Sequence, residues 1–334
     1  MSGRLGLDLV YAHEGSVAAC LAEHAGHVLG VVGFGARPFV PHAPVPWVHV
    51  PVLGGHQASF EIWTSGQPVS DCSTGNIRGA TDGDVLFGSL QLDQRDGIAM
   101  DTLATRAYRE IFAFLDRQGH PHLLRVWNYL PHINASEQGM ERYRRFNLGR
   151  HEAFVQSGRD ITEENVPAAS VLGCGAGPMV IYFLASHARG KPIDNPRQMA
   201  AYRYPEQYGP RSPIFVRAML AGFGDRQCLL LSGTASIVGH ETVHKGDVRQ
   251  QTHETLRNIR TLLQQAYPQG PAGCHEDGIQ FKAYIRHAGD IAPIRECLEQ
   301  EFGAGQHTVY LQSDICRADL LLEIEGVSFC ERPR

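Results

Sequence analysis

The segment at residues 314–326, DICRADLLLEIEG, contains the residues of this chain that are best suited to acid–base chemistry. It places Cys316, Arg317 and two carboxylates around the start of an apolar strand. The two-residue period of a β-strand puts Glu323 and Glu325 on one face. A carboxylate in an apolar setting is either paired with a cation or has a raised pKa, and a raised pKa makes a general acid. An edge strand with a solvated face is the alternative.

Arginine and tyrosine side chains recur in segments bounded by glycine or proline, although the chain carries a net charge of −5. Guanidinium groups bind carboxylates through two parallel hydrogen bonds, and tyrosine hydroxyls add neutral donors. The pattern predicts a site for a small dicarboxylate, and solvated helix faces are the alternative. The predicted substrate-binding residues from this pattern are Arg142, Arg150, Tyr208, Arg217 and Arg286.

Two patterns that resemble cofactor motifs are interpreted as turns or loops. Residues 240–244 read HETVH, and a zinc site of this type needs both histidines on one helical face. Here the pattern follows a strand and Gly239, so we predict a loop at the rim of a pocket. The glycine-rich residues 33–35 and 173–177 do not open a capped helix, so we predict turns. We therefore expect no metal and no cofactor.

Composition narrows the class of protein. A chain of 334 residues with 43% hydrophobic content can bury a large core. Its negative net charge argues against nucleic acid as a partner, and its apolar runs are too short to cross a bilayer. The eight cysteines form no CxxC pair. These features predict a soluble, cytoplasmic protein.

Two halves of the sequence repeat one order of elements, which predicts an α+β fold. Each half runs through a strand, a helix, a strand, a helix and a closing strand. In the first half these elements are expected at residues 85–92, 103–117, 125–130, 136–146 and 179–185. In the second half they are expected at 227–238, 249–266, 281–286 and 291–302, followed by the strand that contains Glu323. A chance likeness between two ordinary α+β segments is the alternative.

The repeat predicts two tandem units, residues 1–190 and 191–334, each with a mixed sheet and two helices packed on one face. Aligned on their closing strands, the first unit has Tyr182 and Leu184 where the second has Glu323 and Glu325. Carboxylates needed only for solubility could occur in either unit. The difference therefore favours a site in the second unit.

Several long motifs resemble two nested families. The run SGTASIVGHETVHKGDVRQQTHETLRNI and the closing LLLEIEG resemble the YjgF/Rid-type fold. The segments RVWNYLPHIN, ERYRRFNLGR and AYRYPEQYGPRSPIFVRA resemble the chorismatase family. The resemblance begins at about Phe60 and implies two tandem YjgF/Rid-like (chorismate mutase-like) units.

The resemblance implies an enzyme that releases pyruvate from chorismate without metal or organic cofactor. The family's acid corresponds to Glu323, which would protonate the enolpyruvyl methylene. Cys316, seven residues earlier, resembles a cysteine of the members that form a hydroxybenzoate, and we favour that product. Ala235 in SGTAS, at the substrate site, resembles instead the members that form a dihydrodiol. The choice between 3-hydroxybenzoate and 4-hydroxybenzoate stays open.

Three alternatives remain beside this prediction. The first is hydrolysis of chorismate to 3,4-dihydroxycyclohexadiene carboxylate and pyruvate. The second is a Rid-type imine deaminase, since fold alone does not fix function. The third is a binding protein for small acids without catalysis. YjgF-type domains form trimers, but an internal repeat could replace part of that interface, so both a monomer and a homotrimer stay open.

Overall fold

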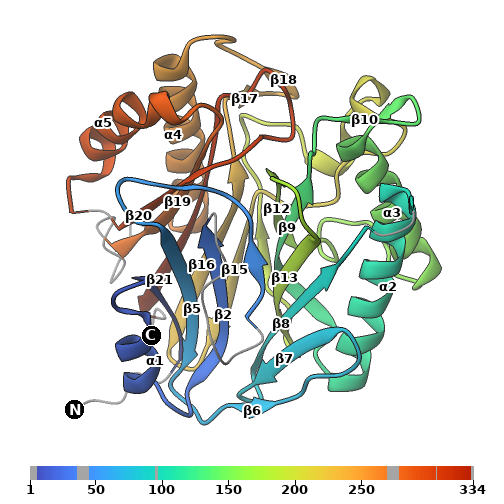
Figure 1. Ribbon diagram of the computed structural model, residues 1–334, viewed down its shortest axis with the longest axis vertical. Helices are drawn as coiled ribbons and strands as arrows, with labels where there is room; N and C mark the ends of the chain where they lie inside the picture. Colours follow the sequence, from blue (N-terminus) through green and yellow to red (C-terminus); the bar gives the residue numbers. More distant parts are fainter. Residues whose placement is uncertain (1–5, 36–44, 95–96, 269–277, 306, 332–334) are drawn as a thin grey trace.

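The computed structural model describes residues 6–35, 45–94, 97–268, 278–305 and 307–331. In Figure 1 the strands fill the middle of the molecule and the longer helices lie outside them. None of the helices in these ranges is long and apolar enough to span a membrane.

The first unit is a six-stranded mixed sheet of order β12-β9-β13-β8-β7-β6. Its strands are β6 (Ser70–Asp71), β7 (Ile77–Thr81), β8 (Val85–Leu92), β9 (His122–Pro131), β12 (Ala168–Cys174) and β13 (Met179–Ser186). Its helices are α2 (Met100–Gln118) and α3 (Arg142–Gln156), which pack against each other. Only β12 and β9 pair in parallel within this sheet.

The second unit is a seven-stranded sheet of order β14-β15-β16-β21-β19-β20-β4. Its strands are β4 (Val52–Leu53), β14 (Lys191–Ile193), β15 (Ala218–Phe223), β16 (Arg226–Thr234), β19 (Gln280–Ile285), β20 (Thr308–Gln312) and β21 (Leu322–Glu331). Its helices are α4 (Val248–Ala266) and α5 (Ile291–Phe302). The Asp247 side chain begins α4 by accepting a hydrogen bond from the Gln250 amide at 3.0 Å.

The two units have the same topology. The order β12-β9-β13-β8-β7 in the first corresponds to β20-β19-β21-β16-β15 in the second, with one parallel pair at the same place. In both units the helices follow the same strands. The predicted α+β class, with two helices on a mixed sheet in each half, is confirmed. The division at residue 190 stays a prediction, and β4, from before it, lies at the edge of the second sheet.

Two local predictions were wrong. The helix expected at residues 136–146 begins only at Arg142, because residues 136–141 form the hairpin β10 (Ser136–Glu137) and β11 (Met140–Glu141). Gln138 and Gly139 have positive φ and make its turn. Residues 33–35 end a strand rather than forming a turn. A Cβ at Gly33 would collide with the Trp47 ring, so close packing explains this glycine.

A third sheet was not predicted. It has the order β1-β5-β2-β3 and consists of β1 (Leu7–His13), β2 (Val28–Gly35), β3 (Trp47–Val48) and β5 (Ala58–Ser65), with α1 (Val17–Glu23) between β1 and β2. All side chains of β5 are buried, because this strand lies between β1 and β2 and its two faces are covered.

Alternate side chains of the closing strand β21 point to opposite faces of the sheet, one apolar and one charged. Leu322 and Ile324 pack into the apolar core beneath α4 and α5. Glu323 and Glu325 point from the opposite face and are also buried. The helix-free face of the second sheet therefore supports the charged groups, as the two-residue period predicts.

Candidate active site

A cavity of about 550 Å³ lies where β12 of the first unit meets β16 and β21 of the second. The join is polar: the Ser232 hydroxyl accepts from the Ala169 amide at 2.9 Å, and the Ser170 hydroxyl accepts from the Gly233 amide at 3.1 Å. The segment 204–217, which contains the 3₁₀ turn η2 (Glu206–Tyr208), also lines the cavity. Both units therefore contribute to its wall.

Glu323 lies in the wall of this cavity with only 4% of its surface exposed. Burial, and next the charge of the neighbouring Glu325, raise the pKa of this carboxyl to about 8, although Arg125 and Arg217 act to lower it. The group is therefore protonated at neutral pH and can donate a proton. Gly233 makes room for it, because a Cβ at that position would overlap the Glu323 carboxylate oxygen.

Glu325 is the ionised member of the pair. Burial would raise the pKa of its carboxyl, but Lys282 and Arg125 together lower it below the ordinary value. Lys282 and Arg125 each approach it to 2.7 Å, and the Trp127 indole and the Ser170 hydroxyl donate at 2.7 and 2.6 Å. A fixed negative charge thus lies two residues from the acid.

The ion pairs around Glu325 join all three sheets. Lys282 of β19 also forms an ion pair with Glu61 of β5, which is fully buried. The Tyr182 hydroxyl of β13 donates to Glu61 at 3.0 Å. Tyr182 and Glu323 correspond in the repeat, since they pair with the corresponding residues Trp127 and Tyr284 on the neighbouring strands. The charged centre is therefore built asymmetrically from two equivalent strands.

Cys316 also lines the cavity, on the loop before β21. Burial, followed by the charge of Glu323, raises the pKa of the Cys316 thiol to about 12. The residue is therefore a neutral thiol at physiological pH and a poor nucleophile. Tyr143, at the start of α3, lines the same cavity. Cys316 can shape this end of the cavity without taking part in proton transfer.

Arginine and tyrosine side chains surround the rest of the cavity. Arg217 donates to the Tyr204 hydroxyl at 2.8 Å, and its buried Nε has no hydrogen-bond partner among the described residues. Arg317 lies 4.0 Å above the Tyr208 ring and donates to the His240 carbonyl at 2.8 Å. Arg144 lines the cavity as well, but it lies 3.5 Å from Glu141, another lining residue. Arg217 and Arg317 therefore remain as the guanidinium groups that can bind a dianion.

Five of the predicted site residues are brought together in this cavity: Glu323, Cys316, Tyr208, Arg217 and Ala235. Their roles stay predictions, but their common location agrees with the site inferred from the sequence. The polar lining also includes residues that were not among the predicted site residues: Glu141, Tyr143, Arg144, Ser170, Tyr204, Gln207, Arg317 and Asp319.

The other three predicted arginines do not line the cavity. Arg142 donates to Glu137 and to the Pro131 carbonyl at 2.8 and 2.9 Å, and so fixes the β10–β11 hairpin. Arg150 is buried beside the Phe146 ring and donates to the Asn147 amide oxygen at 2.9 Å. In this structure neither side chain is placed to touch a ligand in the cavity.

Arg286 acts on the cavity through a loop. Its guanidinium binds Asp314 at 2.7 Å and donates to three backbone carbonyl groups, those of Ile315, Arg317 and Leu320. These contacts fix the loop that carries Cys316. The distribution of contacts assigns Arg286 to positioning rather than to direct binding.

The HETVH segment is not helical. It contains the end of a hairpin formed by β17 (Ile237–Val238) and β18 (Glu241–Thr242). His240 lies 3.1 Å from the Tyr208 hydroxyl, so the segment reaches the rim of the cavity as predicted. Its two histidines do not share a helical face, and the geometry of a zinc peptidase is not formed here.

Comparison with known proteins identifies the family. Residues 61–185 match the family model described as chorismatase FkbO/Hyg5-like, N-terminal. The chain is 34% identical to a 3-hydroxybenzoate synthase of Streptomyces hygroscopicus, over 90% of this chain and 91% of that protein. It is 37% identical to a chorismatase of Streptomyces rapamycinicus, over 80% and 81%.

A solved structure agrees with this result over almost the whole chain. A chorismatase crystal structure at 1.08 Å resolution superimposes with a TM-score of 0.86 and 31% identity, covering 96% of this chain and 98% of that one. These matches confirm the resemblance inferred from the sequence motifs. The protein belongs to the chorismatase family.

Proposed function

We propose that this protein cleaves the enolpyruvyl ether of chorismate to a hydroxybenzoate and pyruvate, with Glu323 as the acid. The observation that carries the proposal is a protonated, buried carboxyl group in the wall of a cavity that is also lined by Arg144, Arg217 and Arg317. The related proteins named 3-hydroxybenzoate synthase and chorismatase support the same substrate and product.

The first step is transfer of the Glu323 proton to the enolpyruvyl methylene carbon, which becomes a methyl group. The ether carbon then carries positive charge, and the Glu323 carboxylate that remains is balanced by Arg125 and Arg217, which favour its ionised form. The negative charge of Glu325 raises the pKa of Glu323, so Glu323 stays protonated before the substrate binds. No residue has to form a covalent bond to chorismate.

The cationic carbon can react with either of two nucleophiles. Attack by the neighbouring ring hydroxyl, followed by loss of pyruvate and aromatisation, divides the atoms of chorismate between hydroxybenzoate and pyruvate. Attack by water instead consumes one water molecule and yields the diol and pyruvate. An enclosed site that holds the ring hydroxyl against the ether favours the internal route.

Two cavity residues bear on this choice. Cys316 supports hydroxybenzoate as the product, because its compact neutral thiol fills the end of the cavity next to Tyr143. Ala235 supports the diol alternative, because it resembles the residue of the diol-forming members. The proposal gives 3-hydroxybenzoate as the main product and allows 4-hydroxybenzoate beside it.

Recognition of the two chorismate carboxylates falls to Arg217 and Arg317 in this proposal. Tyr208 and Tyr204 stack near Arg317 and orient its guanidinium, with ring distances of 4.0 and 5.2 Å. An imine substrate with a single carboxylate would not need both cations. The charge in the cavity therefore favours chorismate over the substrate of a Rid-type deaminase.

Both units of one chain contribute cavity residues, which supports catalysis by a single chain. A cytoplasmic location stays a prediction. Monomer and homotrimer both stay open, and analytical ultracentrifugation distinguishes them.

Incubation with chorismate, followed by separation of the ring products and enzymatic determination of pyruvate, tests the function. The proposal predicts a hydroxybenzoate and pyruvate in equal amounts. A non-aromatic diol would assign the protein to the hydrolytic alternative. Tight binding of chorismate without pyruvate release would leave only a binding protein.

A further inference from the structure

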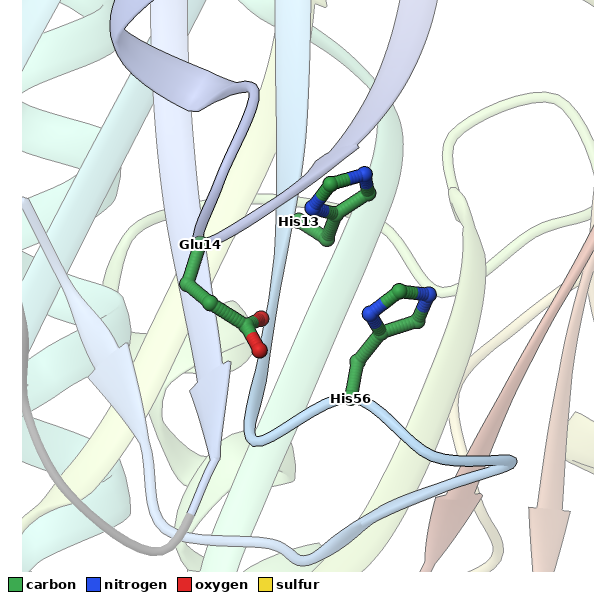
Figure 2. A group of neighbouring side chains, drawn as sticks. All are labelled: His13, Glu14 and His56. Carbon is green, nitrogen blue, oxygen red and sulfur yellow. The ribbon is translucent and has the colours of Figure 1, made fainter.

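Three side chains at the edge of the third sheet form a group that the cavity does not include. His13 and Glu14 lie at the end of β1, and His56 lies just before β5 (Figure 2). One ring nitrogen of each histidine and one carboxylate oxygen lie within 4.8 Å of one another, and all three residues are exposed. The sequence did not reveal this group, because β1 and β5 are distant along the chain.

The carboxylate of Glu14 is held in place by the backbone. The Gln57 amide donates to its Oε1 at 3.1 Å, and the Ala58 amide donates to its Oε2 at 3.2 Å. Each oxygen keeps a free lone pair, because a carboxylate oxygen can accept more than one bond. This arrangement orients an ionised ligand for a cation.

The two imidazole rings are stacked. Their centroids are 4.5 Å apart and their planes differ by 6°. The stack therefore holds two side chains of the type that transition-metal ions bind beside each other. The Gly15 amide lies 3.2 Å from His13 Nδ1, and an ion that binds this ring would replace that hydrogen bond, because a neutral imidazole has only one acceptor nitrogen. In Figure 2 both rings and the carboxylate face one another across an open space.

We propose that His13, Glu14 and His56 form a binding site for one divalent transition-metal ion, with water in the remaining positions. Two imidazoles and a carboxylate suit zinc and its neighbours, whereas magnesium and calcium prefer oxygen ligands alone. Zinc bonds of about 2.0–2.1 Å hold ligand atoms at most about 4.2 Å apart. Ligand atoms that are separated by the full 4.8 Å would have to approach by at least about 0.6 Å, and the stacked rings would have to turn so that their in-plane lone pairs meet at the ion.

The proposed ion would join β1 to β5 and leave the catalytic cavity untouched. None of its three ligands lines the cavity. β5 carries Glu61, which pairs with Lys282 at the centre of the molecule. An ion that binds only the folded chain stabilises it in proportion to its concentration. The site is therefore structural, and it predicts a higher melting temperature in zinc without a change in turnover.

Titration calorimetry of the untagged, full-length chain with zinc at about pH 7.5 tests the proposal, because imidazole is mostly neutral there. We expect one ion per chain, and a loss of affinity of at least about tenfold in both His56→Ala and Glu14→Gln. The matched control is His187→Ala, which removes another exposed histidine and should bind zinc as the wild type does.

Melting curves with and without zinc provide the second measurement. The wild type and His187→Ala should melt at a higher temperature in zinc, and His56→Ala should not. Equal zinc affinity in the wild type, His56→Ala and Glu14→Gln would overturn the proposal, as would the absence of binding by the wild type at millimolar zinc.

Discussion

Glu323 and Glu325 lie two residues apart on one face of β21, yet the pKa of the first is raised to about 8 and the pKa of the second is lowered. Both carboxyl groups are buried, so burial alone does not distinguish them. The difference arises from cations: Lys282 and Arg125 contact Glu325 directly. A pair of acids with opposite shifts is a common basis for acid catalysis at neutral pH.

The pH dependence of kcat/KM follows from the raised pKa of Glu323. The protonated acid is the active form, so kcat/KM should be constant near neutral pH and fall about tenfold per pH unit above about 8. Rates measured with chorismate between about pH 6 and 10 check this. A rate that increases steadily through pH 8 would rule out a protonated Glu323 as the acid.

The same group makes stability depend on pH. The folded pKa of Glu323, about 8, lies above the ordinary value of 4.5, so the folded state keeps a proton that the unfolded state has lost. Its stabilising contribution is complete below about pH 4.5 and is lost as pH rises through about 8. Urea unfolding across this range should show a slope that Glu323→Gln removes.

Glu325→Gln should alter both stability and the pH profile. The substitution removes the negative charge that pairs with Lys282 and Arg125. Breaking a buried ion pair in this way should lower the free energy of unfolding by about 3–5 kcal/mol. The substitution also removes the negative charge that helps raise the pKa of Glu323. The upper limb of the kcat/KM profile should therefore move to lower pH.

Urea unfolding and the pH profile of the folded Glu325→Gln variant provide the measurements. Glu299→Gln, on the exposed side of α5, is the matched control and should change neither. An unshifted profile in a folded Glu325→Gln variant would remove Glu325 from the account of acidity.

Gly233→Ala tests the space that the acid occupies. The added methyl would overlap the Glu323 carboxylate and force it aside. We expect kcat to fall by about 100-fold, as small displacements of catalytic groups do, with a loss of about 1–3 kcal/mol in stability. Gly289→Ala adds a methyl group in open space and should retain full activity. A fully active Gly233→Ala would show that the carboxyl does not need this position.

Cys316→Ala should change the product more than the rate. The neutral thiol shapes the end of the cavity, so its removal leaves room for water next to the cationic carbon. We expect the diol to increase relative to hydroxybenzoate, while turnover falls less than about tenfold because the thiol transfers no proton. Product separation measures the ratio, and Cys20→Ala is the control. The same ratio in both variants would exclude Cys316 from product selection.

The sequence predicted elements well where turn residues bound a periodic segment. The strand at 85–92 and the helix at 291–302 were placed to the residue. The helix α3 was misplaced because the turn at Gly139 was not recognised as the centre of a hairpin. The third sheet was missed because β1 pairs with β5, which is far along the chain, and because β3 is only two residues long.

The acid was visible in the sequence, but its environment was not. Glu323 and Glu325 stand out because they are carboxylates in an apolar strand. The corresponding strand of the first unit has no carboxylates at these two positions. Arg125, which pairs with Glu325, lies 200 residues away, and no local pattern connects them. A signal was present nonetheless: Arg125 and Lys282 occupy corresponding strands of the repeat, each as a charge within an apolar segment.

The arginines show the limit of arguments from composition. Clustering predicted five substrate ligands, but Arg142 and Arg286 are occupied by contacts within the protein. Arg150 lies outside the cavity lining and donates to Asn147, although its buried Nε and Nη1 have no hydrogen-bond partner among the described residues. Whether a guanidinium faces a cavity or a carbonyl group depends on tertiary contacts, which spacing along the chain does not encode.

Pyruvate release by Glu323→Gln, measured beside the wild type, tests the central claim most directly. Glutamine has nearly the same shape but no acidic proton, so the fold should be kept while the proton donor is lost. The Glu299→Gln variant controls for the loss of a carboxylate elsewhere, and melting curves verify folding.

The account predicts that the wild type and Glu299→Gln release pyruvate and hydroxybenzoate in equal amounts, while Glu323→Gln is slower by at least about 100-fold. Near-normal pyruvate release by a folded Glu323→Gln variant would contradict it.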